Sequence, residues 1–246
     1  MDARGQDADR ILLAHVEDLA RRGAYRSFTA FLDMRQYTLV RSVLREGTYR
    51  FFGGYPEAQR GILCVFPQDC EPADAEYPIT CLTFTHPAQF TLSHRDVLGS
   101  LMAQQVQRDT VGDILVTPGK IQCFVTGAAA SVGIGLTRIG RVGVKVTDAL
   151  PYAGDFVQEV RECTGTVSTP RLDAVVRCAV SLGRGACLEL IRAGAVSLNY
   201  LECLAPDKQV QAGDVFSVRG HGKFRVREIT GPTKKGRLHI VIEQFL

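Results

Sequence analysis

The order of apolar and polar residues predicts helices alternating with short strands along the whole chain. Apolar positions recur at helical spacing over 7–22 and the pattern ends at Gly23, which predicts a first helix. A second helical stretch covers about 33–46 and ends at Gly47. The segment "YRFFGGYPEAQRGILCVFP" then predicts a strand, a Gly-Gly turn, a short helical turn and a buried strand ended by proline.

A strand–helix–hairpin–helix–strand order follows from residue 79 onward. "ITCLTFTH" predicts a strand, 94–104 a helix, and "DILVTPGKIQCFVT" a hairpin around Pro118-Gly119. "GAAASVGIGLTRIG" predicts a further helix and "VGVKVTDA" a strand. This order is typical of a small α+β sandwich of the ferredoxin or RNA-recognition type.

The C-terminal third predicts two helices, about 171–180 and 184–193, followed by short strands. The proline-rich and acidic segment "PQDCEPADAEYP" is the best candidate for a boundary before the central part. The expected fold class is therefore α+β with three modules: an N-terminal α/β domain at 1–76, a central RNA-recognition-like domain at 77–165, and a small α+β domain at 166–246.

Composition is that of a soluble globular protein, with 46% hydrophobic and 22% charged residues. The polar, acidic N-terminus lacks the apolar stretch of a signal peptide, and no apolar run approaches the roughly 20 residues that span a bilayer. The 8 cysteines form no C-x-x-C pair. We therefore expect a cytoplasmic protein with reduced thiols that mostly fill the core, and no membrane association.

The net charge of +3 conceals an asymmetry between the two parts of the chain. Residues 168–246 contain 12 Lys+Arg and 7 Asp+Glu, a net of +5, whereas residues 1–167 contain 17 and 19, a net of −2. A basic C-terminal third favours an anionic partner, nucleic acid first, although a solvated charged surface is the alternative.

The His-Arg-Asp triplet within "SHRDVLGS" tests whether this chain is an enzyme. A kinase catalytic loop needs an Asn five residues after the Asp, and Leu101 stands there. Ser93 instead resembles a helix N-cap, with Asp96 completing a capping box. No metal-ligand spacing, nucleophile constellation or cofactor loop is present in the sequence, so we expect no catalytic residue, no metal and no cofactor.

"RLDAVVRCAVSLGRGACLELIRAGAVSLN" with the later "VQAGDVFSV" resembles the RNA-binding domain named for ribosomal protein S-four of the small subunit. The matching positions are Arg171-Leu172-Asp173, Arg184, Leu190-Ile191, Gly194, Val196 and Asn199. The sequence departs from the pattern at Gly183, Cys187, Ala195 and Tyr200.

Four separated motifs extend the resemblance to nearly the whole chain. "FFGGYPEAQRGIL", "LSHRDVLGSLM", "RDTVGDILV" and "SVRGHGKFRV…GPTKKGRL" occur in the order found in the YlmH family. The resemblance implies an RNA-binding protein of the large ribosomal subunit, acting in quality control of subunits obstructed by peptidyl-tRNA. It also implies a direct or indirect link to cell division, with division or quality-control proteins as further partners.

The expected RNA contacts come from this resemblance and from a basic stripe. The stripe consists of Lys223, Arg225 and Arg227, which alternate along one predicted strand and therefore point the same way. Phosphate contacts of this kind give salt-dependent binding of ribosomal RNA or tRNA, recognised by shape. The candidate RNA-binding residues are Arg95, Arg171, Arg177, Arg184, Arg192, Asn199, Arg219, Lys223, Arg225, Lys234, Lys235 and Arg237.

Two other function classes stay open at this point. This type of RNA-binding domain is often fused to pseudouridine synthases or RNA methyltransferases. The synthase Asp of an R-L-D motif is followed by Thr-Ser-Gly, whereas "AVVR" follows Asp173, and no methyltransferase glycine loop appears. A scaffold for division proteins would leave no trace in the sequence.

Overall fold

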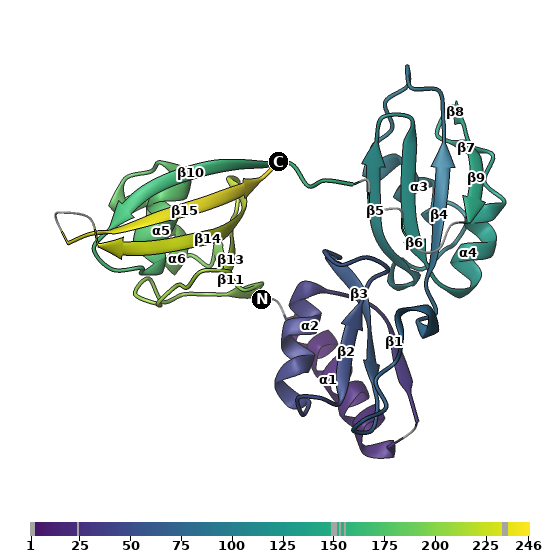
Figure 1. The fold of residues 1–246 in the computed structure, drawn as a ribbon, viewed down its shortest axis with the longest axis horizontal. Coiled ribbons are helices and arrows are strands. Elements are labelled where there is room, and N and C mark those ends of the chain that lie inside the picture. The colour runs from purple at the N-terminus through teal and green to yellow at the C-terminus, as the bar shows by residue number, and fades with distance from the viewer. Residues whose placement is uncertain (1–2, 24, 149–151, 153, 155, 233–235) are drawn as a thin grey trace. The chain divides into compact units, whose positions relative to one another are not determined.

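The computed structural model describes residues 3–23, 25–148, 152, 154, 156–232 and 236–246. The chain forms two compact units, Met1–Phe156 and Val157–Leu246, each built from helices and antiparallel sheets (Figure 1). The predicted α+β fold class is confirmed.

The first part of the N-terminal unit is a three-stranded sheet, in the order β1-β3-β2, covered on one face by two helices. Val16, Leu32 and Leu63 are buried between the helices and this face. The elements are α1 (Ala3–Arg22), β1 (Ser27–Asp33), α2 (Met34–Val40), the 3-10 turn η1 (Arg41–Val43), β2 (Tyr49–Phe52) and β3 (Arg60–Val65).

The second predicted helix, 33–46, is shorter than expected. Asp33 caps its start by accepting a hydrogen bond from Gln36 N at 2.8 Å, but the regular helix ends at Val40. The Ser42 hydroxyl donates to Leu39 O at 2.6 Å, a local bond that competes with continuation of the helix.

The second part of the N-terminal unit has the predicted strand–helix–hairpin–helix–strand order. Its antiparallel sheet runs β5-β6-β4-β9, with α3 and α4 packed over one face (Figure 1). The elements are β4 (Thr80–Thr85), α3 (His94–Met102), the 3-10 turn η3 (Arg108–Thr110), β5 (Val111–Thr117), β6 (Lys120–Val125), α4 (Gly127–Ile134), β7 (Arg138–Ile139), β8 (Val142–Gly143) and β9 (Lys145–Asp148).

The helix predicted from "GAAASVGIGLTRIG" is correct only in its first half. The helix ends at Ile134, with Gly135 as its C-cap, and the β7–β8 hairpin follows. Gly140 turns this hairpin with a φ of +57°, a conformation that glycine adopts without steric cost. Ile139 is fully buried, which explains why the segment folds back instead of continuing as a helix.

The two sheets of the N-terminal unit share a core. Phe31 and Ile62 of the first sheet belong to the same buried cluster as Cys81, Leu115 and Phe124 of the second. We call this cluster the shared core. The two parts form one compact unit. The division into separate domains at 1–76 and 77–165 therefore stays a prediction.

The acidic segment that we expected as a domain boundary is fastened to the first sheet by two arginines. Arg26 donates to Cys70 O and pairs with Glu76, and Arg50 donates to Pro72 O and pairs with Asp74. The segment is therefore a part of the packed unit in spite of its linker-like composition.

The C-terminal unit is a six-stranded antiparallel sheet, in the order β10-β15-β14-β13-β11-β12, with two helices packed on one face. Its core includes Leu172, Val176, Ile191, Phe216 and Ile240. The elements are β10 (Val160–Val167), α5 (Leu172–Val180), α6 (Arg184–Arg192), β11 (Val196–Leu198), β12 (Leu201–Glu202), β13 (Val215–Val218), β14 (Gly222–Pro232) and β15 (Leu238–Phe245).

Strand β10 crosses the position at which we divided the central from the C-terminal domain. It pairs with β15 along its whole length, from Val160 opposite Phe245 to Val167 opposite Leu238. Residues 160–165, which our division assigns to the central domain, therefore pair with the C-terminal sheet.

All eight cysteines are free thiols. Cys64, Cys81 and Cys123 are fully buried in the N-terminal unit, and Cys187 is buried in the C-terminal unit. Burial raises the pKa of Cys123 to about 12 and that of Cys64 to about 11. These thiols fill cores, as expected, and no described helix has the length and hydrophobicity needed to cross a membrane.

Candidate nucleic-acid interface

Four arginines of α5 and α6 surround one buried carboxylate in the C-terminal unit. Arg171 is the N-cap residue of α5 and Arg184 is the first residue of α6. Asp173, only 5% exposed, accepts a hydrogen bond from Arg171 Nε at 3.1 Å, and its other oxygen lies 4.0 Å from Arg184 Nη2. Ser181 ends α5 in the left-handed conformation, with a φ of +54°, and α6 begins three residues later.

Arg177 and Arg192 complete this group, which we call the arginine cluster (Arg171, Arg177, Arg184 and Arg192). Two neighbouring hollows are lined by its members. One of about 190 Å³ lies between Arg171, Arg177 and Arg184, beside Ser168 and Thr169. The other, of about 360 Å³, includes Arg171, Arg184 and Arg192. The structure thus brings together four predicted residues from both ends of two helices.

The charge of the arginine cluster suits a phosphate group, because its four cations outnumber the two carboxylates beside them, Asp173 and Asp207. Asp173 holds Arg171 through a hydrogen bond, whereas Arg184 lies 4.0 Å away. Arg184 remains 73% exposed and Arg171 38% exposed, so both retain donors for an external acceptor. Guanidinium groups bind phosphate oxygens in a bidentate manner. The ion pair with Asp173 engages Arg171 through Nε, along one edge of its guanidinium group.

The predicted basic stripe on β14 has the expected geometry but not the expected free charge. Phe224 and Val226 point into the core, so Lys223, Arg225 and Arg227 lie on the opposite face. Arg225 donates twice to Glu243 Oε2, at 2.7 and 2.9 Å. A phosphate at Arg225 would have to compete with this carboxylate.

The remaining two cations of the stripe also have partners. Arg227 pairs with Glu162 at 2.9 Å. The Lys223 ammonium lies 4.8 Å from the centre of the Tyr200 ring and 5.2 Å from that of Phe245. Such cation–π contacts stabilise the sheet surface. The stripe is therefore a weaker candidate for RNA binding than the arginine cluster.

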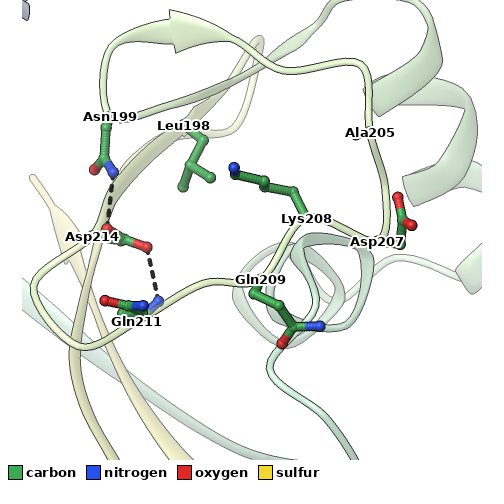
Figure 2. A pocket seen from close by; sticks show the side chains of 8 residues that line it. All are labelled: Leu198, Asn199, Ala205, Asp207, Lys208, Gln209, Gln211 and Asp214. Atoms are coloured by element: carbon green, nitrogen blue, oxygen red, sulfur yellow. Dashed lines mark hydrogen bonds between the residues drawn. The ribbon is translucent and has the colours of Figure 1, made fainter.

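The Asn199 side chain forms hydrogen bonds within the C-terminal unit. Figure 2 shows its side chain directed at Asp214, to which Nδ2 donates at 2.8 Å, while Oδ1 accepts from Val215 N at 3.0 Å. Asp214 in turn accepts from the Gln211 backbone N–H at 2.8 Å. The adjoining hollow of about 580 Å³ contains two acids, Asp207 and Asp214, and a single cation, so it does not favour an anion.

The other predicted positions are scattered. Arg219 and Arg95 are exposed, on the turn after β13 and at the second position of α3. Arg237 donates to Thr166 O at 2.6 Å. Lys234 and Lys235 lie outside the described residues. The role of each of these residues in RNA binding stays a prediction.

The sequence analysis did not single out Asp173 as the residue that organises the arginines, nor Tyr200 and Phe245 as ring partners of Lys223. The only sequence signal for Asp173 was its position two residues after Arg171. Among the described residues, no group of His, Cys, Asp and Glu side chains has the arrangement of a metal site.

Asp96 of the His-Arg-Asp triplet caps α3. Its Oδ2 accepts from the Ser93 backbone N–H at 2.8 Å and from the Ser93 hydroxyl at 2.6 Å, which is the predicted capping box. These hydrogen bonds lower the pKa of Asp96. A carboxylate held by its own helix start is a structural element.

We expect Ser93→Ala to lower the melting temperature at neutral pH without changing RNA binding. Since the folded-state pKa of Asp96 is lowered, its stabilisation is present above the unfolded value and is lost as the pH falls through the folded value. The difference in melting temperature between wild type and variant should therefore shrink in acid. Ser100→Ala, which removes a hydroxyl farther along the same helix, is the control. A difference that is independent of pH would contradict this role.

Comparison with known proteins extends these observations. Residues 72–152 match the family model described as "Putative RNA-binding domain in YlmH". The chain is 29% identical over 225 residues to "Ribosome-associated protein quality control protein P2" of Bacillus subtilis (strain 168), covering 88% of this chain and 86% of the relative.

A solved structure shares the fold. "Cell division protein ylmH from Streptococcus pneumoniae" superimposes with a TM-score of 0.50 at 20% identity, covering 64% of this chain and 97% of that chain. At this identity the likeness concerns the fold alone. The chain is therefore similar to YlmH proteins, and its residues 72–152 match the model of their putative RNA-binding domain.

Proposed function

We propose that this protein is a non-catalytic RNA-binding protein that associates with ribosomal RNA or tRNA on the large ribosomal subunit. Its role would be in quality control of subunits obstructed by peptidyl-tRNA. The observation that carries the proposal is the arginine cluster, in which Asp173 bonds to Arg171 and lies 4.0 Å from Arg184 beside two hollows. The name of the Bacillus subtilis relative supports the ribosomal setting.

The mechanism is one of positioning. Phosphate oxygens of a structured RNA enter between the exposed arginines and accept hydrogen bonds from their guanidinium groups. The affinity of the protein for RNA comes from neutralising these phosphates and therefore falls as salt is added. The side chains of the cluster bind and orient RNA, and no covalent bond is made or broken.

The geometry at Asp173 does not favour an RNA-modifying enzyme. A catalytic Asp has to reach the reacting base, whereas this carboxylate is 5% exposed and engaged by Arg171. Its backbone N–H also donates to Pro206 O at 2.9 Å, which fixes it against the loop before β13.

Sedimentation of a cell lysate tests the proposed association. We expect the full-length protein to travel with free large subunits at low salt and to move to the top of the gradient as salt is raised, because phosphate contacts weaken with ionic strength. Ribonuclease treatment of the lysate is the control for RNA dependence. A protein that stays at the top of the gradient at every salt concentration would contradict the proposal.

A further inference from the structure

A hollow beside the arginine cluster differs from the cluster in charge. We call it the amide hollow: it measures about 580 Å³, and its polar lining consists of Asn199, Asp207, Lys208, Gln209, Gln211 and Asp214 (Figure 2). Two carboxylates and one ammonium group do not favour an anion, but together with the amides they offer acceptors and donors to an uncharged polar ligand. The volume lies within the roughly 300–1,000 Å³ that is typical of sites for small organic groups.

The amide hollow and the arginine cluster are neighbours on the C-terminal unit. Asp207 lines the amide hollow and also the hollow of about 360 Å³ that includes Arg171, Arg184 and Arg192. A ligand with a charged and an uncharged part can therefore place the charged part between the arginines and the uncharged part in the amide hollow. A nucleotide within an RNA chain is such a ligand, because its phosphate carries the charge while its base and ribose are uncharged donors and acceptors.

The loop between the two hollows is fixed to the start of α5. The Leu172 N–H donates to Lys208 O at 2.9 Å. The Asp173 N–H donates to Pro206 O at 2.9 Å. These bonds use N–H groups of the first helical turn, which have no partner within the helix. They also hold the loop in place before a ligand arrives, and a site that is formed in advance loses less entropy on binding.

The opposite wall of the amide hollow contains the hydrogen-bonded side chains of Asn199 and Asp214. Leu198, which is 8% exposed, adds an apolar surface, and Figure 2 shows the Lys208 side chain extended towards it. Within the described part of the chain, the Lys208 ammonium and the Asp207 carboxylate form no hydrogen bond or ion pair. The hollow thus provides an apolar contact for the face of a base and unengaged polar groups for its edge.

We infer that the amide hollow binds the base and ribose of an unpaired nucleotide, next to the phosphate that the arginine cluster binds. This site rests on the proposed function, because RNA supplies the ligand, and it deepens that function by naming the kind of RNA position that is recognised. Bases within an A-form duplex are paired, and side chains cannot read its narrow major groove. The nucleotide therefore comes from a loop, a bulge or an end. Lys208 donates to an oxygen or ring nitrogen of the base, and Asp207 accepts from an amino group or a ribose hydroxyl.

Two RNAs with the same number of phosphates test the site in the full-length protein: a hairpin with an unpaired loop and a fully paired duplex. We expect wild type to bind the hairpin roughly tenfold more tightly, which is the discrimination that one good base contact gives. Lys208→Met removes the donor and keeps the alkyl chain, so it should bring this ratio close to one. Loss of a charge alone weakens binding of both RNAs equally, so the ratio should be unchanged in Lys145→Met, the matched control at an exposed position of β9.

A substitution without a change of charge blocks the hollow by its size. Ala205 is exposed and lines the hollow, so Ala205→Leu should weaken binding of the hairpin. Its affinity for the duplex and its slope of log affinity against log salt should equal those of wild type, because no phosphate contact is lost. Ala212→Leu, at an exposed position of the same unit outside the lining, is the control. Melting temperatures should stay close to that of wild type, since the substituted side chains are exposed.

The NMR signals of the Leu198 methyl groups give a direct readout of the base. The ring current of a base in the hollow should shift these signals when the hairpin is added to leucine-labelled protein, and the duplex should leave them in place. A nucleoside monophosphate distinguishes RNA from a free nucleotide. If it shifts the Leu198 signals and binds as tightly as the hairpin does, the assignment to RNA is overturned.

The remaining outcomes separate this site from the proposed function. If wild type binds hairpin and duplex equally, the amide hollow takes no nucleotide, and the proposed function stands as long as substitutions in the arginine cluster weaken binding. If substitutions in neither place alter RNA binding, both fail. A preference for the hairpin that Lys208→Met and Ala205→Leu each remove, with unchanged melting temperatures, supports the site.

Discussion

Replacing Arg177 and Arg192 together by Glu is expected to release the protein from large ribosomal subunits while leaving it folded. Both side chains are exposed and line the hollows of the arginine cluster. In the described part of the C-terminal unit the ion pairs involve Arg171, Arg184, Arg225 and Arg227, so this substitution breaks none of them. RNA affinity should fall on the order of 100-fold, and the salt slope by about two units.

The choice of residues follows from the carboxylate at the centre of the cluster. Reversing the charge of Arg171 would place a Glu against buried Asp173 and would confuse misfolding with lost binding. Arg177 and Arg192 instead lie in the last turns of α5 and α6. There the lost cation and the added anion each cost only ~0.3–1 kcal/mol of interaction with the helix dipole.

The matched control is Arg45→Glu with Arg161→Glu, which changes the net charge equally at exposed positions outside the cluster. Wild-type and control protein should both sediment with large subunits in a sucrose gradient. If the cluster variant also does so, or if the control is lost equally, the arginine cluster is not the docking surface.

Phe124→Ala should produce the largest loss of stability, and the loss should spread across the N-terminal unit. The side chain is fully buried in the shared core, between the rings of Tyr55 and Tyr152. Emptying such a site costs about 3–5 kcal/mol. Because the core joins both sheets, amide hydrogen exchange should accelerate in β1–β3 as well as in β4–β6.

The same substitution at Phe216 is the control, since that ring is fully buried in the C-terminal unit and stacks on Phe224 at 5.1 Å. Phe216→Ala should accelerate exchange in the C-terminal strands alone. Exchange in β1–β3 that is unchanged by Phe124→Ala would instead show that 1–76 and the central part fold as independent domains.

Local patterns were sufficient to predict the central sheet. The strand–helix–hairpin–helix–strand order and the Ser93 cap follow from alternation, turn residues and capping, which depend on neighbours in the sequence. The end of α4 and the shared core were not predicted. Ile139 turns away from a helix because it is buried by distant residues, and Arg26 fastens a linker-like segment through contacts about fifty positions away.

The residue types of the candidate site could be predicted from the sequence, but not which of its cations are paired with carboxylates. Helical spacing brings the four arginines to the ends of two helices, and the resemblance implied two of them, Arg171 and Arg184. Which cations remain free depends on long-range pairing. Arg225 meets Glu243, eighteen residues away, through the strand register. This spacing is not visible as a sequence motif.

Because the thiols of Cys123 and Cys187 are buried, the rate at which they are chemically modified reports on local unfolding of the protein. Burial raises the pKa of Cys123 to about 12, so the thiol is protonated at neutral pH, and its sulfur is enclosed by the core. Alkylating reagents and oxidants therefore reach it only when the N-terminal unit unfolds locally, while Cys187 reports on the C-terminal unit in the same way. The rates of modification at these two positions would give the opening free energy of each unit within one intact chain.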